Sequence, residues 1–144
     1  MFVYNGAKIG RIILLYLGKG EKILESIQEE IDRQKIRNGI MLSAIGSARK
    51  VVYHRITAIQ DTNSDEFLTV SGPIEIGAIQ GLIIDGIPHL HITFSDLNKT
   101  ITGHLEPGCE VQYLAEIAFA ELEEAHVVRR RNANGICYMC KKEE

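Results

Sequence analysis

Two runs of sequence decide the fold: IPHLHITFS at residues 87–95 and TITGHL at residues 100–105. Side chains alternate between the two faces of a β-strand. In both runs, polar residues occupy one face and apolar residues the other, which is typical of a half-buried antiparallel sheet. The intervening DLNK at 96–99 favours a turn, because Asp and Asn bond their own backbone. The pattern therefore predicts a β-hairpin.

The predicted hairpin gathers three of the chain's five histidines on its polar face. His89 and His91 share one face, and a two-residue or a symmetric four-residue loop places His104 directly opposite His91. Three imidazoles are the ligand count of an open, catalytic-type zinc site. We therefore predict a metal site at these residues, with one zinc ion per chain and another divalent metal as the alternative. Histidines that only form hydrogen bonds are the competing interpretation, and a bulged turn would shift the register.

The hairpin is part of a longer set of motifs. They are GIPHLHI at 86–92, GHLEPG at 103–108, LTVSGPIEI at 68–76 and GIMLSAIGS at 39–47. Together they resemble the PPC domain (plants and prokaryotes conserved), which plant AT-hook nuclear proteins carry and which occurs alone in bacteria and archaea. The chain is similar to the stand-alone prokaryotic type over nearly its whole length. Lys99 and Thr102 depart from the family pattern, which often has glycine at these places.

The resemblance implies an α+β fold, in which an antiparallel twisted β-sheet carries one main α-helix. It implies a single compact domain over residues 1–144, with a terminal strand and tail from about 125 to 144, and assembly as a homotrimer. It also implies that His89, His91 and His104 form a metal site. The AT-hook of the plant relatives is a separate segment, and its Arg-Gly-Arg core is absent from this sequence.

Composition places the chain among ordinary globular proteins, with 45% hydrophobic and 24% charged residues. A chain of 144 residues is long enough for one domain with a real core. It has no apolar run that could span a bilayer, and its three cysteines form no even disulfide framework. We therefore expect a cytoplasmic protein that does not enter membranes. The net charge of −3 argues against strong autonomous DNA binding, although a local basic patch is compatible with DNA contacts.

Hydrophobic periodicity predicts the remaining elements. Apolar residues at helical spacing predict the main helix over residues 21–34. Strands are expected over 2–4, 12–17, 36–45, 51–59, 67–70, 74–84 and 126–131. A glycine turn is expected at 46–47, a turn or bulge at 71–73 and a polar loop at 61–65. We expect the apolar run at 12–17 in the centre of the sheet. Composition leaves 109–122 open between helix and strand, and the family resemblance favours a strand.

Other candidate residues lie outside the hairpin. Glu75 is a carboxylate in an apolar strand that could orient a histidine or serve as a catalytic base. An inter-strand or inter-subunit ion pair is the interpretation we favour for it. Cys137 and Cys140 form a single CxxC pair without the second pair of a zinc ribbon, so we interpret them as two thiols in a tail. We expect His54 at a surface or interface, and residues 129–131, all arginine, as an exposed charged rim with a phosphate contact as the alternative.

Three functions from different classes are compatible with these patterns. The first is a metal-binding module with a regulatory or DNA-associated role. The second is a metal-dependent enzyme that activates water at the histidine site, with Glu75 as its base. The third is a pure protein-interaction module whose histidines only pack. The sequence has no phosphate-binding glycine loop and no Gly-x-Ser-x-Gly elbow, so it leaves open whether the protein is an enzyme.

Overall fold

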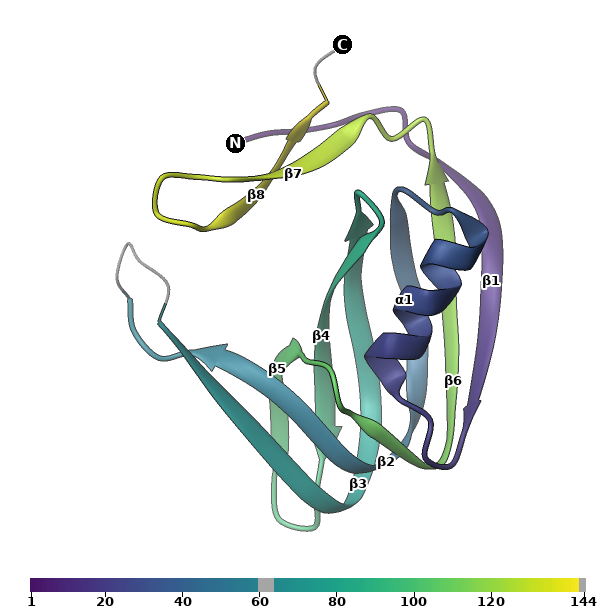
Figure 1. The fold of residues 1–144 in the computed structure, drawn as a ribbon, viewed down its shortest axis with the longest axis vertical. Helices are drawn as coiled ribbons and strands as arrows, with labels where there is room; N and C mark the ends of the chain where they lie inside the picture. The colour runs from purple at the N-terminus through teal and green to yellow at the C-terminus, as the bar shows by residue number, and fades with distance from the viewer. Residues whose placement is uncertain (60–63, 143–144) are drawn as a thin grey trace.

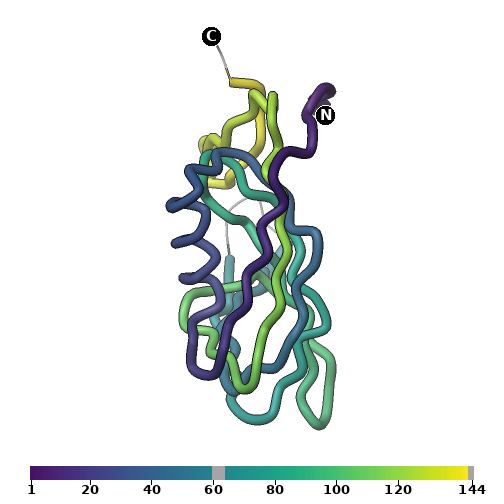
Figure 2. Tube along the Cα trace, turned by 90° about the vertical axis from the view of Figure 1, so that its right-hand side faces the viewer, coloured from purple at the N-terminus to yellow at the C-terminus, as the bar shows by residue number. Residues whose placement is uncertain are grey.

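The structure, a computed structural model, describes residues 1–59 and 64–142. Most of the chain forms one six-stranded antiparallel sheet in the order β1-β6-β2-β3-β4-β5 (Figure 1). The strands are β1 (Lys8–Gly18), β2 (Gly39–Ile56), β3 (Asp65–Ile84), β4 (Ile87–Ser95), β5 (Thr100–Leu105) and β6 (Glu110–Glu123). Helix α1 (Ile23–Gln34) lies against one face of this sheet (Figure 2). The predicted α+β class and single compact domain are confirmed.

Helix α1 forms where the sequence predicts it, but it begins two residues later than expected. Ile23, Ile27 and Ile31 recur every four residues, and all three are buried against the sheet. The helix ends at Lys35, whose φ of 56° lies in the left-handed region. Its N–H donates to the Asp32 carbonyl oxygen, which satisfies a group that the helix end would otherwise leave unpaired. No helix in the described part of the chain is long and apolar enough to cross a membrane.

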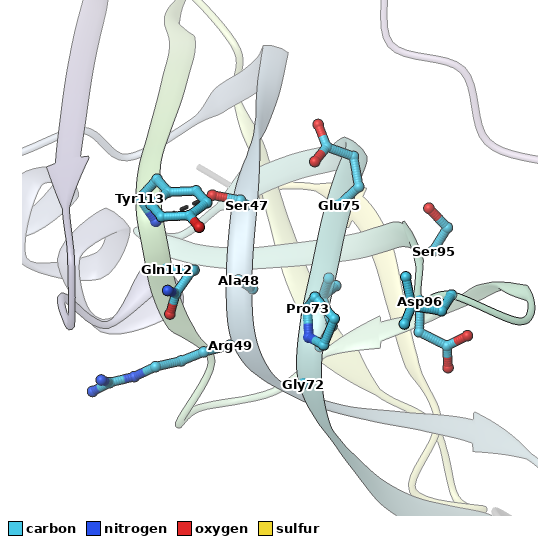
Figure 3. A pocket seen from close by; sticks show the side chains of 12 residues that line it. Ser47, Ala48, Arg49, Gly72, Pro73, Glu75, Ser95, Asp96, Gln112 and Tyr113 are labelled. Carbon is cyan, nitrogen blue, oxygen red and sulfur yellow. Dashed lines mark hydrogen bonds between the residues drawn. The ribbon is translucent and has the colours of Figure 1, made fainter.

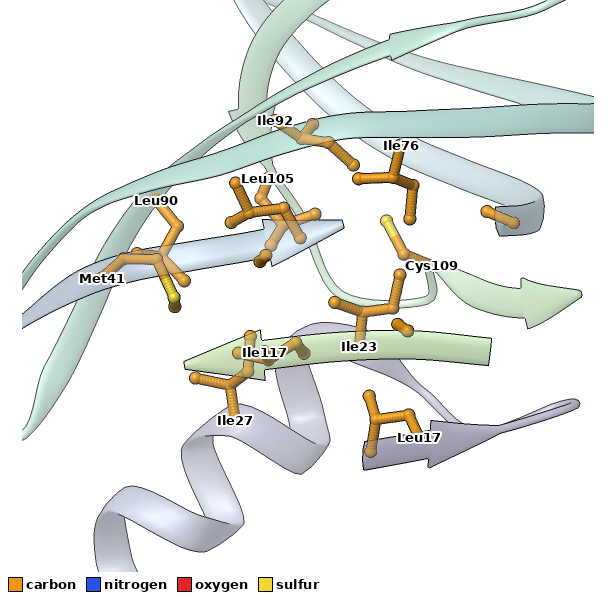
Figure 4. Packing of buried hydrophobic residues seen from close by; sticks show 14 of the residues in the cluster. Leu17, Ile23, Ile27, Met41, Ile76, Leu90, Ile92, Leu105, Cys109 and Ile117 are labelled. Atoms are coloured by element: carbon orange, nitrogen blue, oxygen red, sulfur yellow. The ribbon is translucent and has the colours of Figure 1, made fainter. Parts of the chain in front are cut away.

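The hydrophobic core lies between α1 and the sheet (Figure 4). The inward face of β4 contributes Leu90, Ile92 and Phe94, which are all buried, as the alternation predicted. Consequently the residues that alternate with them, His89, His91 and Thr93, lie on the opposite face of β4. Other buried members of the core are Leu17, Met41, Ile76, Leu105, Cys109, Ile117 and Phe119.

A second pairing of β2 closes part of the sheet into a ring. The C-terminal half of β2 pairs with β5, with Tyr53 opposite Leu105 and His54 opposite His104. Since β2, β3, β4 and β5 are already consecutive neighbours, this contact completes a ring of four strands. Gly103 permits the close approach, because a Cβ there would lie 2.5 Å from the Tyr53 ring and 2.8 Å from the His54 carbonyl oxygen.

Several sequence expectations about the strands are wrong. Residues 2–4 form no strand. The glycine turn expected at 46–47 is absent, because β2 continues through it with local register shifts of the β-bulge kind. Of the turn or bulge expected at 71–73, the bulge is present, because β3 continues there and its register with β2 shifts. The run at 12–17 lies in β1, at an edge of the sheet and not in its centre. Of the polar loop expected at 61–65, residues 61–63 lie outside the described residues.

The C-terminal segment forms a separate two-stranded sheet of β7 (Val127–Arg131) and β8 (Cys137–Lys141). β7 matches the expected terminal strand, whereas β8 occupies the region expected to be a tail. This hairpin lies across one end of the main sheet (Figure 1). It is anchored there by the buried side chains of Val127 and Val128, and by the Arg129 N–H, which donates to Asp85 Oδ2 at 3.1 Å. Because Asp85 lies in the turn that leads into β4, the β7–β8 hairpin is held close to the histidine strand.

Candidate metal centre

The histidine hairpin has the register that the sequence predicts. His91 on β4 pairs directly with His104 on β5. Asp96 shapes the four-residue turn, since its Oδ1 accepts the N–H groups of Asn98 at 2.7 Å and Lys99 at 2.9 Å. The ring centroids lie 5.6 Å apart for His89 and His91, 5.0 Å for His89 and His104, and 5.6 Å for His91 and His104. The three predicted residues thus form a triangle of imidazoles.

This histidine triangle has the size that a shared zinc ion requires. Imidazole nitrogens bind zinc at about 2.0–2.1 Å, which places the ring centres of tetrahedral ligands about 5 Å apart. The observed separations of 5.0 to 5.6 Å are close to that value. Imidazole is also a donor type that zinc prefers. The residues therefore fit a zinc ion in chemistry and in the spacing of their rings. Their donor nitrogens do not form a set within 4.8 Å of one another, so the rings must turn to share an ion.

Glu106 contacts two imidazoles at once. Its Oε1 lies 2.6 Å from Nδ1 of His54 and 3.0 Å from Nδ1 of His104. A carboxylate accepts hydrogen bonds, so these contacts favour the tautomer that holds a proton on Nδ1 of each ring. This leaves a lone pair on Nε2 of each ring, the form in which an imidazole binds a metal.

His54, which the sequence placed at a surface or interface, is half-buried beside His104. Its ring stacks on His104 at 4.4 Å, and Phe67 lies 5.1 Å from it. The donor atoms of His54, His104 and Glu106 lie within 4.8 Å of one another, so they form an overlapping second donor set. The alternation of β2 indicates which face His54 occupies, but only the long-range pairing of β2 with β5 brings it to His104.

Glu75 does not lie with the histidines. It pairs with Ser95 near the far end of β4, whereas the residue of β3 opposite His91 is Gln80. The Glu75 side chain is exposed and lines a separate hollow that includes Tyr113 (Figure 3). The carboxylate within reach of the imidazoles is therefore Glu106, which the sequence analysis did not single out.

The two cysteines of the CxxC pair do not form a chelating unit. Cys137 and Cys140 lie on β8, three residues apart, so alternation directs them to opposite faces of the strand. Both thiols are free. Cys137 lies at the edge of the histidine cluster, beside residues of the β7–β8 turn.

Burial and neighbouring charges favour neutral imidazoles. Burial, followed by the positive charge of Arg129 and then the other histidines, lowers the pKa of His89 to about 4. Burial, followed by His54, lowers the pKa of His104, although Glu106 acts in the opposite direction. Since a metal binds the neutral ring, both residues are in the ligand form at neutral pH.

We expect the metal-free protein to lose stability as the pH falls from about 6.5 toward 4. In the unfolded chain His89 binds a proton near its usual pKa of 6.5, whereas in the folded protein it stays neutral down to about 4. The unfolded state binds more protons in this window, so a falling pH favours unfolding. His89 costs no stability above about pH 6.5 and an increasing amount as the pH falls toward 4. Urea denaturation at about pH 7, 5.5 and 4.5 measures this loss. His89→Gln should lose less stability than the wild type, and an equal loss in both would contradict this prediction.

Comparisons with known proteins agree on one family. The family model described as Plants and Prokaryotes Conserved (PCC) domain matches residues 4–123. Two proteins named "Bifunctional protein GlmU", from two Synechococcus strains, are each 33% identical to the chain, over 122 and 113 residues. These matches cover 83% and 77% of this chain but only 18% and 17% of the two proteins. The chain therefore spans less than a fifth of the length of these curated relatives.

Solved structures share the fold over nearly their whole length. A metal-containing protein from Archaeoglobus fulgidus has a TM-score of 0.76 at 21% identity, and the match covers 94% of this chain and 95% of that one. A plant- and prokaryote-conserved (PPC) protein from Pyrococcus horikoshii has a TM-score of 0.77 at 21% identity, with 99% and 100% covered. A candidate DNA-binding protein from Bacteroides thetaiotaomicron has a TM-score of 0.78 at 17% identity, with 96% and 100% covered. At these identities the likeness shows the fold alone.

Proposed function

Because the chain belongs to the Plants and Prokaryotes Conserved (PCC) domain family, whose model matches residues 4–123, we propose that it is a metal-binding member of that family. The metal is zinc, about one ion per chain, and its ligands are His89, His91 and His104. The observation that carries the proposal is the triangle of ring centroids 5.0 to 5.6 Å apart. A structural neighbour that is a metal-containing protein gives further support. Another divalent metal is the alternative.

We assign the zinc to the histidine triangle, although the set with all its donor atoms within 4.8 Å of one another is His54, His104 and Glu106. A ring nitrogen binds a metal in the plane of its ring, along the lone pair. The His54 and His104 rings are stacked with 22° between their planes, and their Nδ1 atoms both face Oε1 of Glu106, which leaves no room for an ion between them. Glu106 already accepts a hydrogen bond from each of them. We therefore assign Glu106 to orienting His104, and His54 to packing against that ring.

A zinc ion held by three histidines has one open position, where it acts as a Lewis acid or activates a bound water. We propose a regulatory or DNA-associated role in the cytoplasm, and the candidate DNA-binding proteins that share the fold support the DNA association. The alternative is a metal-dependent enzyme. In that alternative, the base is the pair of His54 and Glu106 and not Glu75, because that pair lies beside the proposed ligand His104.

The proposal is tested by metal analysis of protein purified without added metal. We expect about one zinc per chain by elemental analysis, removed by a chelator and restored by added zinc. A thermal unfolding scan should show the zinc-loaded protein to be the more stable form, because zinc binds the folded state alone. Folded protein that contains no metal and binds none when zinc is added would refute the proposal and favour an interaction module.

Glu106→Gln is expected to weaken zinc binding by roughly 10- to 100-fold, as loss of a partner that orients a ligand typically does. The amide keeps the size of the side chain but lacks the charge that holds the proton on Nδ1 of His104. Competition with a chromophoric chelator measures the affinity. Glu66→Gln is the matched control, since Glu66 pairs with Arg55 away from the imidazoles. Equal affinities for the two variants would assign Glu106 no orienting role.

We also propose that the protein is a homotrimer. The support on this chain is an apolar outer surface on β1 and β2, where Leu14 is 80%, Tyr16 65% and Ile45 49% exposed. Uncovered apolar area of this kind marks an interface. Light scattering after size-exclusion chromatography should give three times the monomer mass, and Leu14→Glu should give the monomer. Leu97→Glu is the control, because Leu97 is 84% exposed in the β4–β5 turn. A monomeric wild type would refute the trimer.

A further inference from the structure

We call His54 and the three residues of the histidine triangle the histidine cluster. A cavity of about 570 Å³ lies between this cluster and the β7–β8 hairpin. One wall carries the imidazoles of His54, His89 and His104, from three different strands. The opposite wall is the hairpin itself, with all three consecutive arginines of β7, Arg129, Arg130 and Arg131. We call these three residues the arginine wall. The size is in the range of small-molecule sites, and the walls combine fixed backbone with a few convergent polar groups.

The three arginines of the arginine wall differ from the other arginines of the chain in their ion pairing. The other five each form an ion pair with a carboxylate, and they are Arg11, Arg33, Arg37, Arg49 and Arg55. Within the described residues, none of the three wall arginines forms such a pair. Arg130 and Arg131 instead donate to the carbonyl oxygens of Arg129 and Gly135 at 3.1 and 3.0 Å. Within residues 1–59 and 64–142, these three guanidinium groups thus line the cavity without an ion pair of the kind that the other five arginines form.

The nearby carboxylates have other contacts. Glu106 accepts hydrogen bonds from His54 and His104. Asp85 accepts the Arg37 side chain on one oxygen and the Arg129 backbone N–H on the other. Asp65 lies on the cavity wall and has interactions of its own. The positive charge of the arginine wall thus faces the imidazoles across the cavity, and an anion bound there would complement it.

We infer that this cavity binds a small organic anion whose phosphate or carboxylate group contacts the arginine wall while the rest of the molecule reaches the histidine cluster. Guanidinium groups present paired donors that match both of these oxyanions. A concave hollow of this size admits a small molecule and not a duplex, which separates this inference from DNA binding. This inference rests on the proposed metal function, because the anion would bind beside the open coordination position of the metal.

The experiment titrates inorganic phosphate and acetate into zinc-loaded protein by calorimetry, at constant ionic strength set with chloride. The test variant is Arg129→Gln combined with Arg131→Gln, because the two side chains share one face of β7. The Asp85 contact uses the Arg129 backbone, so the hairpin keeps its anchor. The control is Arg33→Gln, which removes a guanidinium of α1 that does not line the cavity.

At least one of the two anions should bind the wild type and Arg33→Gln equally, and the double variant roughly tenfold or more weakly. The stronger of the two identifies the phosphate or the carboxylate class. Titrations of metal-free His91→Ala separate this inference from the metal proposal, because the arginine wall is intact in that variant. Anion binding that needs the arginines but not zinc would support the anion site independently of the proposed metal site. Equal anion affinity in the double variant, or a short DNA duplex that requires the same arginines and is not displaced by phosphate, would overturn it.

Discussion

Replacing His91 with alanine is expected to remove zinc from the purified protein while leaving its fold intact. His91 is exposed on the outer face of β4, so its side chain contributes little to the core. It supplies one of three proposed ligands, and its loss leaves two imidazoles. The zinc affinity should fall by more than the roughly 10- to 100-fold that loss of an orienting partner causes. Elemental analysis and chelator competition measure this, with circular dichroism as the check on folding.

His126→Ala is the matched control, because His126 is the fifth histidine and is exposed outside the cluster. Its variant should retain about one zinc per chain. A second comparison, His54→Ala, separates the two donor sets that share His104. If His91→Ala keeps its zinc and His54→Ala loses it, the ion is held by His54, His104 and Glu106, and the ligand assignment proposed here is wrong.

The histidine hairpin could be predicted from sequence because every interaction that defines it is local. Alternation assigns the faces of β4 and β5, and Asp96 with its two backbone hydrogen bonds fixes a symmetric turn. Only nine residues separate Thr93 from Thr102, so one turn determines the whole register. That is why the pairing of His91 with His104 matches the prediction.

The other half of the candidate site could not be predicted in this way. His54 reaches His104 through the pairing of β2 with β5, strands about fifty residues apart in sequence, and no local pattern specifies that contact. Glu106 lies in a Pro-Gly turn, where its sequence context indicates a loop and not a partner for two imidazoles. The cavity also needs β8, in a segment whose composition resembles a tail. Long-range strand pairing explains the omission of His54 alone. Glu106 is only two residues from His104, and β8 pairs with β7 across a short turn, so for these two it was the composition of the segment that misled.

The backbone of the site tolerates no side chain at Gly81 on β3. Gly81 pairs with Leu90, which lies between His89 and His91 on β4. Gly81 has a φ of 147°, in a region that L side chains rarely adopt. A Cβ at this position would lie 2.0 Å from the His89 carbonyl oxygen and 3.0 Å from the Leu90 Cα. Both are backbone atoms of β4, so no rotamer change relieves the clash, and β4 itself must move.

We therefore expect Gly81→Ala to lower the free energy of unfolding by about 3 kcal/mol or more and to weaken zinc binding as well. The metal-free protein should be used for urea denaturation, so that lost zinc does not add to the change in stability. Gly72→Ala is the control, because Gly72 has a similar φ of 136° with no atom within 4 Å of its added Cβ. It carries the backbone strain without the clash, and should lose about 1–2 kcal/mol. Equal losses at the two glycines would mean that backbone strain alone accounts for the effect. A larger loss at Gly81, together with weaker zinc binding, would show that the spacing of β3 and β4 at this point holds His89 and His91 in place.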